Sequence, residues 1–385
     1  MISMINNTAN VVIIGGGING LATAYNLAKM GESDIVLVER EYIASGATGR
    51  CGAGIRQQWG TEKNCILSRE SVRMFENLEE TLDYDHDIEF KQKGYLFLAY
   101  DEGLFEQFKK NVKLQNDLNI PSRLLTPGEI KDIAPHVNIN GLYGGTICEE
   151  DGHANPFHVS EAYRKAAERL GVKIYTYTEV WDIETERGEV TGVITDKGKI
   201  STKKVLNTAG GHAKEVGRMA GIELPIYPER HEAMVSEPLD PFQGPMIVSL
   251  YHDFYMQQVP HGSFLMGHGD PEEPESLNIN SSVKFPIKLS KKIASVFPPL
   301  KDIKIIRQWA GLYDMSPDAQ PILGETSVKG FYTSAGYSGH GFMIAPYTSK
   351  LVAQLILEQE PELDISMLNY DRFERGELIL EPSVV

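Results

Sequence analysis

Three glycines near the N-terminus have the spacing of a phosphate-binding turn. Gly15, Gly17 and Gly20 form the pattern G-x-G-x-x-G. In this pattern the first glycine allows a tight turn, the second lets backbone approach a pyrophosphate, and the third permits close packing of a helix on a strand. Glu39 follows Gly20 by nineteen residues, a spacing at which a carboxylate can bind a ribose hydroxyl. These residues therefore predict the binding of a dinucleotide.

The elements that must position these residues are visible in the apolar pattern. Residues Val11 to Ile14 are all apolar, which is typical of a short strand buried on both faces. A helical pattern follows the glycines and stops at Gly31, and a second strand over Asp34 to Val38 leads to Glu39. A helix N-terminus at this turn offers N–H groups and the positive end of its dipole to a pyrophosphate. The unit is Rossmann-type, and Glu39 argues against NADP because it would repel a 2′-phosphate.

A second glycine-rich stretch, SGATGRCGAGIRQQWG at residues 45–60, indicates whether the bound dinucleotide is NAD or FAD. A nicotinamide enzyme would normally continue from Glu39 directly into another βαβ unit. Here the strand runs into this loop and then into a helix predicted for about residues 61–81. Backbone N–H groups of the loop and the hydroxyls of Ser45 and Thr48 could meet phosphate and ribityl oxygens, so we expect FAD. The alternative is an ordinary surface turn.

Four further motifs, together with the two above, resemble a known family. They are DGHANPFHVSEAYRKAAERLGV (151–172), NTAGGHA (207–213), RQWAGLYDMSPDAQPILG (307–324) and GFYTSAGYSGHGFMIAP (330–346). Over nearly the whole chain the sequence resembles the glycine and D-amino-acid oxidase superfamily of flavoproteins. Within it, the sequence is similar to the sarcosine oxidase-like branch that includes the catalytic β subunits of archaeal dye-linked L-proline dehydrogenases.

The resemblance and the pattern along the chain predict a fold and a domain division. The fold is α/β with an α+β second domain: a Rossmann-type FAD-binding domain is interleaved with a mixed-sheet substrate domain. Residues 1–85, 144–225 and 305–385 would form the discontinuous FAD-binding domain. Residues 86–143 and 226–304 would form the substrate-binding domain.

Composition fits a globular enzyme of this kind. Of the 385 residues, 42% are hydrophobic and 23% are charged, and the net charge of −16 argues against binding nucleic acid or an anionic membrane surface. The sequence has no apolar run near the roughly 20 residues of a membrane span and no evident signal peptide. Its three cysteines are scattered, which suits a reducing cytoplasm. We expect a cytoplasmic protein without a metal site.

The residues expected to contact FAD come from the two glycine-rich stretches and from later turns. Val180 falls where the resemblance places backbone hydrogen bonds to the adenine. The motif GYSGHGFMIAP places a helix N-terminus where it can stabilise negative charge on a reduced flavin; the alternative is a plain turn capped by His340. The expected cofactor-binding residues are Gly15, Gly17, Ile18, Asn19, Gly20, Glu39, Arg40, Ser45, Gly46, Ala47, Thr48, Gly49, Arg50, Cys51, Gly52, Ile55, Val180, Ala209, Gly210, Gly311, Tyr313, Gly336, Gly339, His340, Gly341, Phe342 and Met343.

Arg56 is the residue expected to bind the substrate. In the resemblance, GIRQQWG aligns with a segment whose arginine holds a substrate carboxylate over the flavin, and guanidinium binds carboxylate through two parallel hydrogen bonds. The alternative is a surface or phosphate-facing arginine, although Arg50 is the better candidate for a cofactor contact. Tyr251, Tyr255 and His268 could line the pocket beside the flavin or simply belong to the core. With Arg56, they are the expected catalytic residues.

Three departures from the family pattern point away from a monomeric oxidase. Met343 stands where some members have a lysine, so a second positive charge on the carboxylate is missing. Gly311 stands where monomeric sarcosine oxidases have a cysteine bonded to FAD, so FAD should be non-covalent. Leu265 stands where oxidases have a lysine that promotes reaction with oxygen, and without that cation superoxide-like charge loses its stabiliser.

The expected reaction is oxidation of a small amino or imino acid by hydride transfer from Cα to flavin N5. L-Proline is the preferred substrate, pyrroline-5-carboxylate would be the product, and electrons would pass to a dye-type acceptor or a partner subunit. The resemblance implies a second, different subunit and FMN at the interface; Pro156 replaces the histidine that binds FMN covalently in heterotetrameric relatives. The alternatives are a sarcosine, glycine or D-amino-acid oxidase that uses oxygen, and a non-catalytic dinucleotide-binding subunit.

Overall fold

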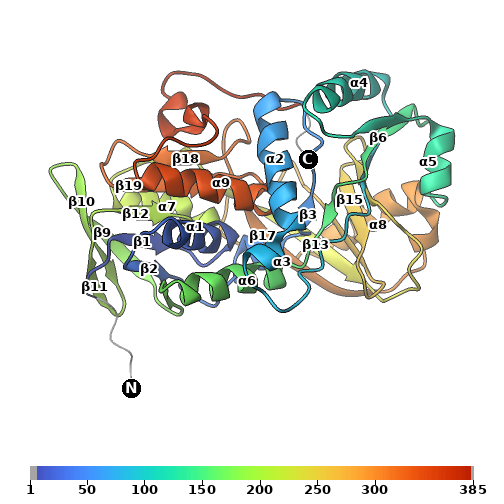
Figure 1. Cartoon of the computed structure of the whole chain (residues 1–385). Helices are drawn as coiled ribbons and strands as arrows, with labels where there is room; N and C mark the ends of the chain where they lie inside the picture. The colour runs from blue at the N-terminus through green and yellow to red at the C-terminus, as the bar shows by residue number, and fades with distance from the viewer. Residues whose placement is uncertain (1–6, 383–385) are drawn as a thin grey trace.

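The computed structural model describes residues 7–382, and within that range the strands form four sheets (Figure 1). The first sheet has the order β18-β19-β12-β1-β2-β8 and is parallel except for β18. In that order its strands are Ile322–Glu325, Phe331–Ala335, Val205–Asn207, Val11–Ile14, Ile35–Val38 and Lys173–Tyr175. Every residue of β1 and β2 is buried, as the apolar runs predicted.

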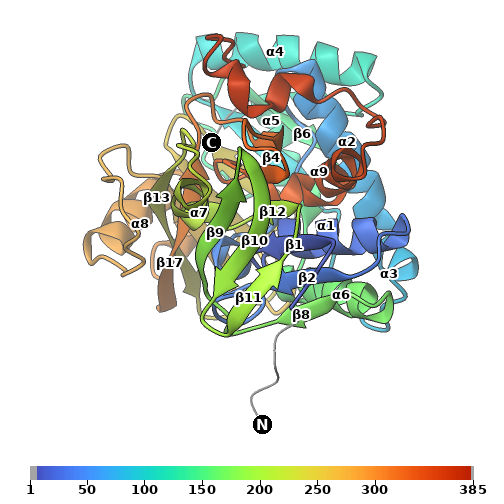
Figure 2. The same cartoon turned by 90° about the vertical axis from the view of Figure 1, so that its left-hand side faces the viewer.

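Helices cover one face of this sheet, and a small antiparallel sheet covers the other. Val11 and Ile13 of β1 pack in the core beneath the helices, whereas Val12 and Ile14 pack in the core on the opposite face. The helices are α1 (Ile18–Lys29), α2 (Glu62–Glu76), α6 (Pro156–Arg169) and α9 (Gly341–Ile356). The opposite layer contains β9 (Val180–Glu186), β10 (Glu189–Thr195), β11 (Gly198–Ser201) and α7 (Ala213–Met219), and β9–β11 stand in front of β1 and β2 in Figure 2.

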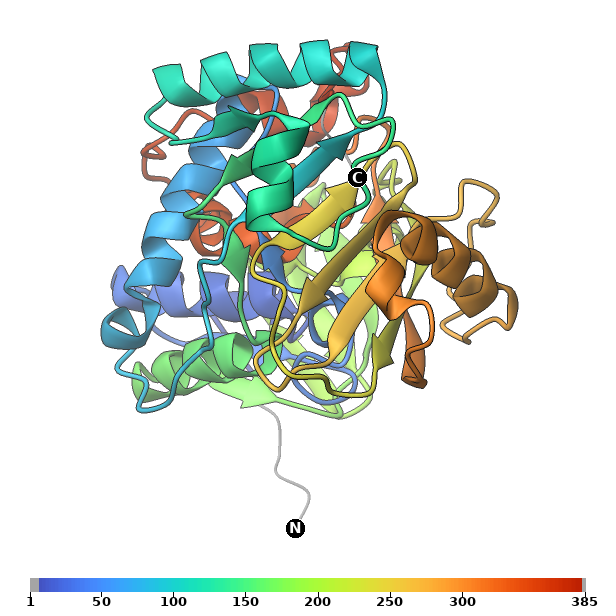
Figure 3. The ribbon, with the colours of Figure 1, turned by 90° about the vertical axis from the view of Figure 1, so that its right-hand side faces the viewer.

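The second large sheet has the order β17-β13-β16-β15-β14-β4-β6-β5 and is antiparallel except between β14 and β4. Its strands, in that order, are Ile305–Met315, Tyr227–Ser236, Phe264–His268, Phe254–Gln258, Met246–Ser249, Tyr95–Ala99, Gly144–Cys148 and Arg123–Leu125. Helices α5 (Pro127–Ile133) and α8 (Lys284–Val296) pack on one face, and α4 (Glu102–Asp117) packs on the other (Figure 3). The expected fold of a Rossmann-type unit interleaved with a mixed-sheet unit is confirmed.

Two strands depart from the expected domain division. Strand β6 pairs with β4 and β5, and β17 pairs with β13 along ten residue positions from Tyr227↔Met315 to Ser236↔Ile305. Residues 144–148 and 305–315 therefore belong to the second sheet, although the sequence pattern had placed them with the FAD-binding residues. The rest of the division remains a prediction.

The remaining elements are short. Strands β3 (Gly54–Ile55) and β7 (Gly152–His153) form a small antiparallel ladder. The helix expected for residues 61–81 divides at Asn77 into α2 and α3 (Leu78–Thr81). The 3₁₀ helices are Ala47–Arg50, Gly210–His212, Pro298–Leu300, Ser366–Leu368 and Tyr370–Arg372. Between residues 7 and 382, no helix combines the length and apolarity needed to cross a bilayer.

Candidate active site

A cleft of about 310 Å³ is lined by residues of both large sheets. From the first sheet, Ile14, Val38 and Thr208 lie at or just after the carboxyl ends of β1, β2 and β12. Ligands of open α/β sheets bind at such strand ends. The second sheet contributes residues of β13, β15 and β17 to the opposite wall.

The first turn of α1 faces this cleft and has the form that an anion requires. Gly17 is the N-cap residue and carries no side chain, and the hydroxyl of Thr48 accepts the N–H of Ile18 at 3.1 Å. A Cβ at Gly20 would lie 2.1 Å from the carbonyl oxygen of Gly15, so the close helix–strand approach expected there is present. Asn19 Oδ1 is buried and has no hydrogen-bond partner among residues 7–382. With Gly17 at its N-cap, the helix points its first backbone N–H groups and the positive end of its dipole at the cleft, and these are the groups that a pyrophosphate binds.

Glu39 stands at the end of β2 with its carboxylate held by backbone. Oε2 accepts the N–H of Gly16 at 2.7 Å, and Oε1 accepts the N–H of Glu41 at 2.7 Å and the hydroxyl of Ser45 at 3.3 Å. An ionised carboxylate offers about four acceptor positions. Glu39 lines the cleft, and with three of these positions used it can accept one further bond from a ribose hydroxyl.

Arg50 joins the glycine-rich loop to the second sheet. Its Nε donates to the Ser45 carbonyl and its Nη1 to the Ala310 carbonyl, both at 3.0 Å, while Trp309 Nε1 donates to the Arg50 carbonyl at 2.8 Å. A Cβ at Gly311 would lie 3.0 Å from Arg50 Cβ. The glycine at 311 thus leaves room for Arg50 at the wall of the cleft. Together, the N-terminus of α1, the Glu39 carboxylate and the Arg50 guanidinium give a set of donors and acceptors that fits FAD.

The expected cofactor residues divide into two groups. On the lining of the cleft are Gly15, Gly17, Ile18, Asn19, Glu39, Arg40, Ser45, Gly46, Ala47, Thr48, Arg50, Cys51, Val180, Ala209, Gly210, Gly311, Tyr313, Gly339, Gly341 and Phe342. Behind the lining are Gly20, Gly49, Gly52, Ile55, Gly336, His340 and Met343. The glycines of the second group allow close packing: a Cβ at Gly49 would lie 2.3 Å from the Ala44 carbonyl oxygen.

The wall formed by β13 contains a histidine that sequence reasoning missed. His231 lines the cleft, its ring stacks on Tyr313 with centroids 3.6 Å apart, and its Nε2 lies 2.9 Å from Glu229 Oε1. Its position follows from the register His231↔Gly311 between β13 and β17, which no local pattern discloses.

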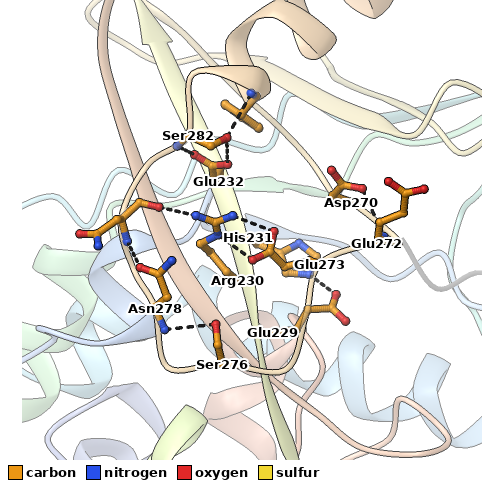
Figure 4. Close-up of polar contacts among 12 residues, drawn as sticks. Glu229, Arg230, His231, Glu232, Asp270, Glu272, Glu273, Ser276, Asn278 and Ser282 are labelled. Atoms are coloured by element: carbon orange, nitrogen blue, oxygen red, sulfur yellow. Dashed lines mark hydrogen bonds and ion pairs between the residues drawn. The ribbon is translucent and has the colours of Figure 1, made fainter.

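A segment without regular structure, residues 270–282, is fastened to β13 beside this wall. In Figure 4, Nε and Nη2 of Arg230 each donate to the Glu273 carboxylate at 2.8 Å. The Glu232 carboxylate accepts the N–H and hydroxyl of Ser282 at 2.6 and 2.7 Å. Ile279 of this segment lines the cleft. The fastening therefore fixes one border of the cleft.

Arg56 is only 1% exposed and is not among the residues that line the cleft. Its Nη1 donates to the Gln58 carbonyl at 2.7 Å, and its guanidinium lies 3.7 Å from the centre of the Trp59 ring. The rings of His340 and Trp59 meet edge to face, with centroids 4.6 Å apart. Burial lowers the pKa of Arg56, and the nearby acidic groups oppose this effect. A guanidinium remains charged in proteins nonetheless.

The turn before α9 places two titratable groups close to the lining. His340 is the N-cap residue of α9 without a side-chain capping bond, and burial lowers its pKa to about 3, so its imidazole is neutral. Asp314, which sequence reasoning missed, lines the cleft and accepts the Gly336 N–H at 2.6 Å. Burial raises the pKa of Asp314 to about 6, although backbone hydrogen bonds oppose the shift.

Of the three further catalytic candidates, only Tyr255 lines the cleft. Burial raises its pKa well above the usual value, so the phenol is neutral. Tyr251 is 61% exposed and lies beside Tyr100, 6.2 Å between ring centroids. His268 is buried against α8, where its ring stacks on Phe285 at 5.1 Å. The structure therefore does not bring Tyr251 and His268 to the pocket, because they occupy a turn and the opposite face of the sheet.

Known proteins resemble this chain over nearly its whole length. The FAD dependent oxidoreductase family, DAO, matches residues 10–355. The chain is 31% identical to sarcosine oxidase subunit beta of Arthrobacter sp. over 381 residues, which cover 97% of this chain and 93% of that protein. It is 29% identical to the protein of the same name from Rhodobacter capsulatus over 377 residues, or 97% and 90% of the two chains.

A solved structure agrees with these relatives. L-Proline dehydrogenase from P. horikoshii superimposes with a TM-score of 0.93 at 36% identity, covering 97% of this chain and 100% of that chain. The resemblance inferred from the motifs is thus confirmed by sequence and by fold. The chain belongs to the FAD-dependent oxidoreductase family.

Proposed function

We propose that this protein binds FAD non-covalently and oxidises a small amino or imino acid, with L-proline as the preferred substrate and pyrroline-5-carboxylate as the product. The observation that carries the proposal is the buried guanidinium of Arg56, which packs on Trp59 next to His340, the residue before Gly341 of the cleft lining. An amino acid differs from a simple amine by its carboxylate, and arginine is the side chain suited to bind that group in a dry site.

The chain's own residues would bind and orient the reactants. Gly17, Ile18 and Glu39 would hold the pyrophosphate and ribose, and Arg56 would anchor the substrate carboxylate. The neutral rings of Tyr255 and Tyr313 would pack against the apolar part of the substrate and exclude water. Bound FAD would supply the hydride acceptor. Holding the substrate Cα–H at near-attack distance would then account for much of the rate.

Similarity to named proteins supports the substrate class and leaves two substrates to compare. The 36% identity to an L-proline dehydrogenase favours L-proline. The 31% identity to a sarcosine oxidase subunit favours sarcosine, the second candidate. Both are secondary amino acids, so the same anchor at Arg56 would serve either.

The proposal includes an acceptor other than oxygen. Leu265 on β16 approaches the glycine-rich loop, where a Cβ at Gly52 would lie 3.4 Å from its Cδ2. An apolar side chain at this place gives no positive charge to stabilise developing superoxide. We therefore propose a dye-type acceptor or a second subunit, as the word "subunit" in the relatives' names suggests, and FMN at that interface. The free thiols of Cys51, Cys65 and Cys148 suit a cytoplasmic location.

Anaerobic flavin reduction tests this function. Purified holoenzyme is mixed with L-proline, D-proline, sarcosine, glycine and pyrrolidine, and the bleaching of the flavin band is followed. The expected result is fastest reduction by L-proline, followed by slow reoxidation in air and fast reoxidation by an artificial dye. Fastest reduction by sarcosine would transfer the proposal to the second substrate, and absence of bleaching with every compound would refute it.

A further inference from the structure

A buried carboxylate outside the cleft is bonded to the residues that follow Arg56. Asp151 is 0% exposed. Its Oδ1 accepts the backbone N–H of Gln57 at 2.9 Å, and its Oδ2 accepts the side-chain amide of Gln58 at 2.9 Å. Both oxygens thus bind donors from the two residues directly after Arg56.

The small ladder of β3 and β7 brings these distant residues together. Ile55 pairs with Gly152, so Arg56 directly follows β3 at the end of the ladder where Asp151 directly precedes β7. The Asp151 carbonyl also accepts the N–H of Gly94, just before β4, at 2.9 Å. One residue therefore ties the Arg56 loop to the second sheet.

Gln58 transmits this anchoring to Arg56. Its side-chain amide donates to the Tyr95 carbonyl at 2.8 Å as well as to Asp151, and its Oε1 accepts the hydroxyl of Thr146 at 2.8 Å. The backbone carbonyl of the same residue accepts Nη1 of Arg56 at 2.7 Å. A displacement of Gln58 would therefore move an acceptor that orients the guanidinium.

We propose that Asp151 is a positioning residue for substrate binding: its buried carboxylate holds Gln57 and Gln58 so that Arg56 presents its guanidinium to the substrate carboxylate. The inference rests on the proposed role of Arg56. Two N–H donors face Asp151, so both of its oxygens must act as acceptors. An amide in its place has one acceptor oxygen and would turn its NH₂ group toward a donor.

The ionisation of Asp151 gives the proposal a second readout. Burial raises the pKa of Asp151 to about 7, against the opposing hydrogen bonds of Gln58 and Gln57. The titratable groups that face it are Arg56, Cys148 of β6 and Tyr95 of β4; Gln57 also contacts Glu150 at 3.2 Å. Protonation below pH 7 removes one acceptor, so substrate affinity should weaken as pH falls through this value.

Single-turnover flavin reduction of the Asp151→Asn holoenzyme tests the inference. The reactants are the best substrate of the panel above and the amine that lacks only its carboxylate, which is pyrrolidine in the case of L-proline. We expect the apparent dissociation constant of the amino acid to rise about ten- to a hundredfold, the loss associated with one hydrogen bond to a charged group. The maximum reduction rate and the binding of pyrrolidine, read from its inhibition constant where its turnover is slow, should change less than threefold. The weakening of affinity below pH 7 should disappear in the variant.

Two comparison variants separate the possible outcomes. Asp318→Asn also removes a buried carboxylate, but one that binds Arg372 and neither Gln57 nor Gln58, and it should lower thermal stability without changing the preference for a carboxylate. Gln58→Met removes the side-chain amide that donates to Asp151 and should give the same result as Asp151→Asn. It replaces Asp151→Asn as the test if the Asp151→Asn protein folds poorly. Equal losses for the amino acid and for pyrrolidine, or no loss for either, would overturn the inference. Arg56→Lys, measured in parallel, distinguishes this failure from failure of the proposed anchor: if Arg56→Lys also affects both compounds alike, the anchor itself is wrong.

Discussion

The two most deeply buried arginines that the structure describes differ in the groups that hold them. Arg372 is 0% exposed, and its Nε and Nη2 donate to the two carboxylate oxygens of Asp318 at 2.9 Å. Its other hydrogen bonds go to backbone carbonyls, among them that of Leu368, and its guanidinium lies 4.1 Å from the centre of the Phe373 ring. Arg56 is 1% exposed and is held by the Gln58 carbonyl and the face of Trp59.

The difference indicates two uses of a buried charge. The Arg372–Asp318 pair fixes the C-terminal 3₁₀ helices to the turn between β17 and β18. Here the planar guanidinium stabilises the fold. Burial would raise the pKa of Asp318, but the hydrogen bonds and charge of Arg372 hold it below the usual value. Arg56 is instead held by a backbone carbonyl and an aromatic ring, and in the proposed function its fork binds a ligand carboxylate. Stability should therefore depend on one arginine and substrate binding on the other.

The largest effect is expected at Arg372. Arg372→Met leaves the Asp318 carboxylate buried without its guanidinium, and breaking a buried pair in this way costs about 3–5 kcal/mol. The free energy of unfolding from a chemical denaturation curve should fall by that amount. Catalytic efficiency per bound flavin should remain within twofold, because neither Arg372 nor Asp318 lines the cleft.

The double variant Arg372→Met/Asp318→Asn is the matched control. It removes both charges, and replacing both members of a buried pair is often close to neutral. Recovery of most of the lost stability would support the electrostatic explanation. A loss as large as that of the single variant would instead assign the effect to packing around residue 372.

The next largest effect is expected at Arg56. Arg56→Ala removes charge-assisted bonds of about 1.5–3 kcal/mol each, so kcat/KM for the amino acid should fall at least tenfold and up to about a thousandfold. FAD content should stay near normal because α1 and Glu39 are untouched. Pyrrolidine turnover should be poor in the wild type and hardly affected by the substitution. Loss of FAD with retained activity per flavin would place Arg56 with the cofactor and contradict the comparison.

The parts of the site that sequence predicted are those fixed by neighbouring residues. Gly15, Gly17 and Glu39 belong to one strand–turn–helix–strand unit, so their spacing alone sets where they meet a ligand. Arg56 follows the adjacent loop and was recognised through the family resemblance.

The parts that sequence missed depend on pairing between distant strands. Asp151 reaches the Arg56 loop only through the register of β3 and β7, and His231 reaches the cleft only through that of β13 and β17. The same limit explains why β6 and β17 were assigned to the wrong domain: the residues of a strand do not show which sheet it joins. Long-range register is set by packing of the whole sheet.

The misplacement of His268 has a related cause. Strand β16 is covered on both faces, so its alternating residues are apolar or small on either side. Phe264 and Met266 pack with α8, whereas a Cβ at Gly267 would lie 2.4 Å from the Tyr255 ring. Alternation shows that His268 shares a face with Met266, but it does not reveal which face borders the cleft.

A buried carboxylate without a guanidinium should behave differently from Asp318. Asp314 accepts a backbone N–H, and burial raises its pKa from 3.8 to about 6. A raised folded-state pKa means that its contribution to stability is fully present below about pH 4 and is lost as pH rises through 6. At about 1.4 kcal/mol per pKa unit, the wild type should lose about 1–3 kcal/mol over this range.

Asp314→Asn removes this titration and keeps an acceptor for the Gly336 N–H. The stability difference between variant and wild type, measured by thermal unfolding, should therefore shift in favour of the variant between pH 4 and pH 8. A difference that is constant over this range would show that Asp314 titrates normally.

The smallest effect is expected at a third arginine, intermediate between the two compared above. The side chains of Arg230 and Glu273 are 15% and 9% exposed, and their two-pronged bond fastens residues 270–282 at the border of the cleft. Glu273→Gln keeps the size of the side chain and one acceptor oxygen but loses the charge, which for a partly exposed pair contributes about 1 kcal/mol. Because Ile279 of the same segment lines the cleft, loosening this border should speed FAD release about two- to fivefold while leaving kcat unchanged.

Glu272→Gln removes the same charge from the neighbouring exposed residue and should leave FAD release unchanged. Equal release rates for the two variants, followed by flavin fluorescence after dilution, would mean that the Arg230–Glu273 pair serves the fold, as Arg372–Asp318 does, and has no part in holding the cofactor.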